Sequence, residues 1–220
     1  MFSNLKNLFA SEKATPPDSL EQARIEKMVE TLGEPDHIDK DTDTSMRVDI
    51  YAFGRNFIEE CETDADDDEG YVLVTSGMSD HLMSAPEGFD GEESLAVELI
   101  WYVRDLNPEY FKNLRWLAKL PFMDKTWFGL GHTVPMPKPP LSFSPLQTFL
   151  FLPPIISRDR FMFDDLESQG QSVETLVVHL ISAPEYHLIK TEDGLSQFLN
   201  LLDEKGYPPV FDPARKTIVD

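Results

Sequence analysis

The sequence predicts an α+β fold, a mixed α/β sandwich in which a central mixed sheet is flanked by helices within a single domain. Three observations favour this class. At least six segments have strand character and three have helical periodicity, and the two kinds do not alternate regularly along the chain. The 220 residues suit one large domain, and no internal repeat or long linker divides them. Hydrophobic residues make up 41% and charged residues 27%, which is ordinary for a globular chain.

Helices are expected at residues 19–32, 108–120 and 192–204. Apolar residues recur at helical spacing in each, and capping residues mark the ends. Ser19 and Gln22 have the spacing of a capping box. Asn107 is a good N-cap for the second helix, and Pro121 is expected to end it. Thr191 is expected to cap the third helix.

Strands are expected at residues 47–52, 71–75, 95–104, 148–152, 160–163 and 175–181. In the first, Val48, Ile50 and Ala52 alternate with polar or aromatic residues, which predicts a half-buried strand. The others are rich in β-branched and aromatic residues. Residues 122–140 contain several glycines and prolines and are expected to cross the domain irregularly.

The chain is expected to divide into a terminal segment with a short helix (residues 1–18), the domain (19–205) and a loose tail (206–220). The first residues lack the continuous apolar run of a signal peptide. No apolar stretch reaches the length of a transmembrane helix. The one cysteine, Cys61, cannot form an intramolecular disulfide, which is compatible with a reducing compartment. These features predict a cytoplasmic protein that does not enter a membrane.

The chain is strongly acidic, with a formal net charge of −21 at pH 7. Such a surface repels nucleic acids and anionic lipids and attracts cationic partners. Residues 59–69 concentrate the charge, since eight of these eleven residues are acidic. Asp64, Asp66 and Asp68 have the spacing of the first calcium ligands of an EF-hand, but the turn glycine and the terminal glutamate are missing. The stretch is therefore interpreted as a solvated loop or as a contact surface for a basic partner, without a metal.

Candidate catalytic residues gather at residues 75–81, where Ser76, Ser79, Asp80 and His81 are close in sequence. A catalytic triad is assembled in space rather than along the chain, and the G-x-S-x-G elbow is absent. A turn that ends a strand explains these residues more simply. The chain also has no phosphate-binding loop and no zinc-ligand spacing. We therefore expect no enzymatic activity and no cofactor; a hydrolase would require Ser79, Asp80, His81 and His132 to converge in one cleft.

The segment WFGLGHTVP, residues 127–135, resembles the W-x-G-x-G-H-T-x-P segment of bacterial members of the suppressor-of-fused-like domain family. Residues 71–80, YVLVTSGMSD, are similar to the family's Y-x-T-x-G-x-S-D. The strand that ends in Leu152-Pro153-Pro154 and the closing residues 185–202 follow in the family's order. The resemblance covers about residues 49–202, and the acidic residues 59–69 are a departure from it.

The resemblance implies a mixed α/β interaction fold without a catalytic centre. The animal namesake of the family clamps a short peptide that adds a β-strand, and bacterial members have been proposed to be immunity proteins. It therefore implies a non-catalytic protein-binding domain, most simply an immunity protein that neutralises a polymorphic toxin by direct binding. Another adaptor role or a hydrolase are the alternatives. The partner is expected to be a protein, for example a basic toxin domain; its identity and the oligomeric state stay open.

The expected binding surface combines an exposed sheet edge, the acidic residues 59–69 and the turn at residues 75–80 beside them. His132 can instead be a structural histidine that hydrogen bonds to the backbone. Trp127 can instead be a core residue rather than a residue that contacts a partner. The candidate partner-binding residues are Asp64, Asp66, Asp67, Asp68, Ser76, Ser79, Asp80, Trp127 and His132.

Overall fold

One open mixed sheet of eight strands organises the domain, as seen in the computed structural model, which describes residues 19–57, 69–85, 87–89, 93–206 and 209–219. Its strands are β1 (His37–Asp39), β2 (Asp49–Asn56), β3 (Glu69–Ser76), β4 (Ala96–Val103), β5 (Thr133–Pro135), β6 (Thr148–Leu152), β7 (Glu167–Ser168) and β8 (Gln171–Ile181). The order across the sheet is β1-β2-β3-β4-β8-β6-β5, and β7 pairs with β8. The predicted α+β class and the single domain with a central mixed sheet are confirmed.

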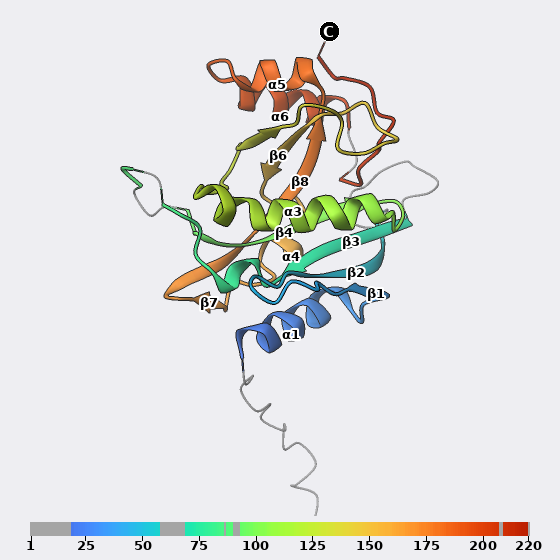
Figure 1. Cartoon of the computed structure of the whole chain (residues 1–220). Coiled ribbons are helices and arrows are strands. Elements are labelled where there is room, and N and C mark those ends of the chain that lie inside the picture. The colour runs from blue at the N-terminus through green and yellow to red at the C-terminus, as the bar shows by residue number, and fades with distance from the viewer. Residues whose placement is uncertain (1–18, 58–68, 86, 90–92, 207–208, 220) are drawn as a thin grey trace, which may run out of the picture.

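The first four strands form an antiparallel meander, whereas β4 and β8 are parallel. β6 then pairs antiparallel with β8 and with β5, which forms the second edge. Every residue of β4 is buried, as expected for a central strand that is covered on both faces. β1 and β5 are the two edges of the sheet, and the β1 edge is labelled in Figure 1.

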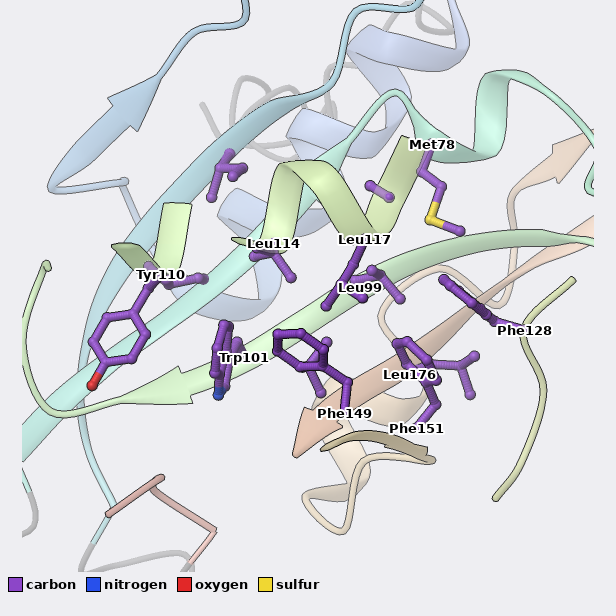
Figure 2. Packing of buried hydrophobic residues seen from close by; sticks show 14 of the residues in the cluster. Met78, Leu99, Trp101, Tyr110, Leu114, Leu117, Phe128, Phe149, Phe151 and Leu176 are labelled. Atoms are coloured by element: carbon purple, nitrogen blue, oxygen red, sulfur yellow. The ribbon is translucent and has the colours of Figure 1, made fainter. Parts of the chain in front are cut away.

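Helices flank the sheet on both faces: α1 (Leu20–Leu32), α3 (Pro108–Asp124), α4 (Ser157–Arg160), α5 (Ala183–Ile189) and α6 (Gly194–Glu204), with the 3₁₀ turn η1 (Met78–Asp80). Leu114 and Leu117 of α3 pack with Leu99 and Trp101 of β4 in the largest cluster (Figure 2). A second cluster joins α1 and the residues around α4 to the opposite face of β2, β3 and β4. A third joins α5 and α6 to β6 and β8.

β2 is buried on both faces, so the prediction of a half-buried strand is wrong. Val48, Ile50 and Ala52 do alternate as predicted and face the α3 cluster. Tyr51 and Phe53 on the other face belong to the α1 cluster. The face of β2 that carries Tyr51 and Phe53 is therefore covered by helix α1, which the alternation of polar and apolar residues did not predict.

The second helix continues past the predicted end, because Pro121 lies inside α3 rather than after it. Its ring is buried beside the core, and its carbonyl accepts hydrogen bonds from the backbone amides of Lys125 and Thr126. Lys125 adopts the left-handed conformation, with φ of 51°, and ends the helix there. Packing and this C-terminal cap offset the hydrogen bond that the proline cannot donate.

Two further predicted elements differ. Residues 160–163 are the end of α4 and a turn rather than a strand, since the amide of Phe161 hydrogen bonds to the carbonyl of Ser157. Helix α6 begins at Gly194 with Asp193 at its N-cap position, whereas the Thr191 hydroxyl donates to the carbonyl of Leu188. The preceding helix α5 was not predicted.

The tail is packed rather than loose. Val210, Phe211 and Ile218 are buried, and the amide of Phe211 donates to the carbonyl of Tyr102 on β4. Arg215 forms two hydrogen bonds, of 2.6 and 2.8 Å, to the buried carboxylate of Glu185 on α5. Scattered apolar residues gave no periodic signal in this segment, which is why its packing was missed. No helix in the described part of the chain is long and apolar enough to cross a membrane.

Candidate protein-binding site

The turn after β3 is held by a buried polar network. Arg24, fully buried on α1, donates to the hydroxyls of Ser76 at 3.2 Å and Ser79 at 3.1 Å. It also donates to the Asp80 carboxylate at 2.6 Å. Glu98, fully buried on β4, lies 3.4 Å from the Arg24 Nε atom. The network ties α1, the turn and the central strand together.

Glu98 organises the turn itself. Its Oε1 atom accepts the backbone amides of Gly77 and Ser79, each at 3.0 Å, and the Ser79 hydroxyl at 2.7 Å. Its Oε2 atom accepts the Thr75 hydroxyl at 2.6 Å. Burial opposes the charge of Arg24, but Glu98 and Asp80 outweigh it and raise the pKa of Arg24. Arg24 therefore keeps its charge at neutral pH although it is buried.

Ser76 and Ser79 are thus buried inside the domain, and only Asp80 among the three turn candidates reaches the surface. The Ser79 hydroxyl is engaged by Glu98 and Arg24 rather than by a histidine. His81 instead lies edge-on to Phe122, with ring centroids 5.9 Å apart. These contacts do not support the hydrolase alternative, and they explain the turn residues by structure.

Trp127 and His132 lie against each other, with ring centroids 4.5 Å apart. The Nδ1 atom of His132 is 3.3 Å from the carbonyl oxygen of Trp127, so the predicted hydrogen bond to the backbone is confirmed. Both side chains are half-buried, and Trp127 also contacts Phe89. Gly131 has a φ of 75°, and its amide donates to the carbonyl of Phe151 on β6. The segment is therefore fixed to the sheet.

Asp64, Asp66, Asp67 and Asp68 lie outside the described residues. Glu69, where the description resumes, begins β3, whereas Ser76 ends it. Eight strand residues span about 23 Å at about 3.3 Å per residue, so β3 separates Glu69 from the turn. Glu69, the one described residue of the acidic stretch, therefore lies at the opposite end of β3 from the turn, and the position of the other residues stays a prediction.

A second acidic group, Asp39, Asp41 and Asp43, is bound by cations of α3. Lys119 lies 2.6 Å from Asp41 and 3.0 Å from Asp43, and Arg115 lies 3.0 Å from Asp39. Burial raises the pKa of Asp41, but the Lys119 ammonium and two backbone amides lower it further than burial raises it. These carboxylates dock the β1–β2 connection on α3.

The β1 edge offers an open surface for a protein partner. Among the described residues no strand pairs with its outer side. A groove of about 510 Å³ lies beside it, lined by His37, Asp39, Leu106, Pro108, Phe111, Lys112 and Arg115. Ile38 on this edge is 38% exposed. The opposite edge, β5, carries Pro135, which cannot donate a backbone hydrogen bond.

Three of these features were missed by sequence reasoning. β1 is only three residues long and shows no usable alternation. Arg24 lies four residues before the buried Met28, so a cation on the apolar face of α1 was the available signal. Glu98 interrupts an apolar strand, which is the usual sign of a buried charge with partners.

Comparisons with known proteins agree with this architecture. The chain has a TM-score of 0.63 and 19% identity to a structure described as a SUFU homologue from Neisseria gonorrhoeae FA 1090, covering 91% of this chain and 97% of that chain. It has a TM-score of 0.64 and 13% identity to a chain of the Sufu–Fu complex, covering 93% of each. Against Drosophila Suppressor of Fused the TM-score is 0.56 at 12% identity, with 77% of this chain and 42% of that chain covered.

These low identities show a shared fold. A comparison with curated protein sequences finds no significant match. The model of the suppressor of fused protein (SUFU) family, however, matches residues 45–216, which is most of the chain and includes both motif segments. Proteins of this family interact with other proteins, as the Sufu–Fu complex illustrates. The chain belongs to the suppressor of fused protein family.

Proposed function

We propose that this chain is a non-catalytic, cytoplasmic immunity protein that neutralises a polymorphic toxin by binding it directly. The observation that carries the binding role is the family match over residues 45–216. The net charge of −21 favours a basic partner, such as a toxin domain with a cationic substrate groove. A role as an adaptor is the second candidate, because the structurally similar Sufu chain is found in a complex with Fu.

The partner is proposed to add a strand beside β1. An unpaired edge offers backbone donors and acceptors, while the neighbouring groove can take alternate side chains of an incoming strand. Leu106 and Phe111 give the groove an apolar part, and Lys112 and Arg115 give it a polar rim. The Asp39 carbonyl of β1 already accepts the Arg115 guanidinium at 2.7 Å, so an incoming strand is proposed to pair with the other backbone groups of this edge and to place its side chains in the groove.

The acidic residues 59–69 are proposed to accelerate association. Charges at the rim of an interface act at long range and stay solvated in the complex. Replacing Asp64, Asp66, Asp67 and Asp68 by Asn should slow association about 3- to 30-fold at low salt, and the effect should shrink towards physiological ionic strength. An unchanged rate and salt dependence would remove the role of this stretch.

The immunity role is tested by searching the genes next to this one for a large secreted protein and by producing its variable C-terminal domain in cells. We expect co-expression of this chain to restore growth of cells that produce that domain, and the two proteins to co-purify. Co-purification without restored growth would favour the adaptor role, and absence of both would contradict the immunity role.

The β1 surface is tested separately with Ile38→Lys. A lysine on the edge should impede strand addition and weaken binding at least about 10-fold. Leu199→Lys on α6 is the matched control, since Leu199 is 39% exposed, close to the 38% of Ile38. Equal effects of the two variants would mean that added positive charge, and not the edge, explains the loss.

A further inference from the structure

A second cavity lies on another part of the molecule and shares no residue with the groove beside β1. Its volume is about 290 Å³, close to the lower limit of small-molecule sites and suited to a single side chain. Gly129 and Leu130 form one wall, Glu174 and Thr175 of β8 a second, and the residues that follow α4 a third.

The floor of this cavity is apolar and firmly packed. Val97, Phe128 and Leu176 line it, and all three belong to the α3 core cluster. Phe128 stacks on Phe151, with ring centroids 4.2 Å apart (Figure 2). The cavity is therefore a preformed depression over the core.

Carboxylates dominate its charged lining. Glu93, Asp164 and Glu174 line it together with one cation, Arg160, so the formal net charge of the lining is −2. Glu93 is fixed there, because its Oε1 atom accepts the amide of Leu130 at 3.2 Å. A Cβ atom at residue 129 would collide with the other Glu93 oxygen, so the glycine of the WFGLGH segment admits this carboxylate.

Partial burial, with the charges of Glu93 and Asp164, raises the pKa of Glu174, although the Ser94 amide and Arg160 oppose the shift.

Large apolar side chains stand exposed at the rim. Leu130 is 51% exposed and Phe161 is 57% exposed. The guanidinium of Arg160 lies over the Phe161 ring, 5.9 Å from its centre, so this ring already contacts a cation, with which an incoming cation would compete. An apolar floor, an aromatic face and an excess of carboxylates together match a side chain with an apolar stem and a planar cationic head.

We propose that this cavity binds an arginine side chain of a basic protein partner, with the guanidinium between Glu174 and Asp164 and against Phe161. Arginine fits better than lysine, because its planar fork pairs with carboxylates and stacks on an aromatic ring. The proposal deepens the proposed function by naming an anchor residue of the partner. It can be tested without that partner.

The probe is N-acetyl-arginine amide, titrated into the isotopically labelled full chain and followed by NMR of backbone amides. We expect saturable shifts at Gly129, Leu130, Thr175 and Leu176, with a Kd of about 1–10 mM in low salt. N-acetyl-norleucine amide, which has a similar stem without the charge, should not shift them. Absence of saturable shifts, or equal shifts with both probes, would overturn the proposal.

Variants at the cavity should act in opposite directions. Glu174→Gln with Asp164→Asn should weaken arginine binding about 5- to 10-fold, because both counter-charges are lost. Arg160→Gln should strengthen it about 2- to 5-fold at low salt, since a competing cation is removed. Glu192→Gln with Asp203→Asn, both exposed near α6, makes the same charge change elsewhere and should leave the Kd unchanged.

Unaltered binding in the Glu174 and Asp164 variant would overturn the assignment, as would an equal loss in the Glu192 and Asp203 control. These outcomes concern the cavity alone. Neutralisation of a toxin through the β1 edge could still be observed if the arginine probe failed, so the two proposals fail separately.

Discussion

Arg24→Met tests whether the buried network around Glu98 holds the domain together. The substitution keeps the length of the side chain but removes every charged contact with Ser76, Ser79, Asp80 and Glu98. Glu98 would then stay buried without its counter-charge. Breaking a buried ion pair on one side costs about 3–5 kcal/mol, against a typical total stability of about 5–15 kcal/mol.

The partner substitution shows how much of that cost is coupling. In Glu98→Gln the amide oxygen can still accept the Gly77 and Ser79 amides, so we expect a smaller loss of about 2–4 kcal/mol. The double variant should be more stable than the sum of the single losses predicts, by about 1.5–3 kcal/mol, because neither charge is then left alone.

Urea unfolding followed by circular dichroism measures these free energies. Asp80→Asn is the milder variant if Arg24→Met does not fold; it should cost about 1 kcal/mol or less, since the Asp80 side chain is 43% exposed. A loss below about 1 kcal/mol for Arg24→Met, or strict additivity in the cycle, would refute the account of the network.

Two further predictions concern glycine and histidine. Gly131→Ala should destabilise the domain by about 2–4 kcal/mol, because φ is 75° and the new Cβ would lie 2.6 Å from Leu195 Cδ2. Gly170 has a φ of 82° but open space around it, so Gly170→Ala should cost only about 1 kcal/mol. Equal losses of the two variants in thermal unfolding would contradict the packing argument. Burial and the charge of Arg215 lower the pKa of His179 to about 4, whereas the pKa of an unfolded histidine is about 6.5. As the pH falls from about 6.5 to about 4, the unfolded state therefore binds the proton first. The free energy of unfolding should fall by about 1–3 kcal/mol over this range. His179→Gln should flatten this pH dependence and the exposed His187→Gln should not, as measured by urea unfolding at each pH.

The sequence was informative where local patterns and the final structure agree. Apolar spacing and capping residues located α1, and β6 occupies the residues predicted for it. The errors arose where tertiary contacts decide. Pro121 is kept inside α3 by core packing and a left-handed cap, and residues 160–163 are drawn into a turn although their composition favours a strand. The tail has no periodicity, yet its Arg215 pairs with a carboxylate 30 residues away along the chain.

The motif residues mostly build the fold, and this bears on where specificity lies. Ser76 and Ser79 close a buried network, and Gly131 permits the close approach of Leu195. Substituting them would perturb the scaffold and weaken any binding indirectly. In the proposed functions a partner is instead recognised by residues that reach the surface, such as Ile38 at the β1 edge and Phe161 at the acidic cavity, which are 38% and 57% exposed. The sequence could not indicate these residues, because a single exposed apolar residue is common on every protein surface and acquires meaning only from its neighbours in the fold.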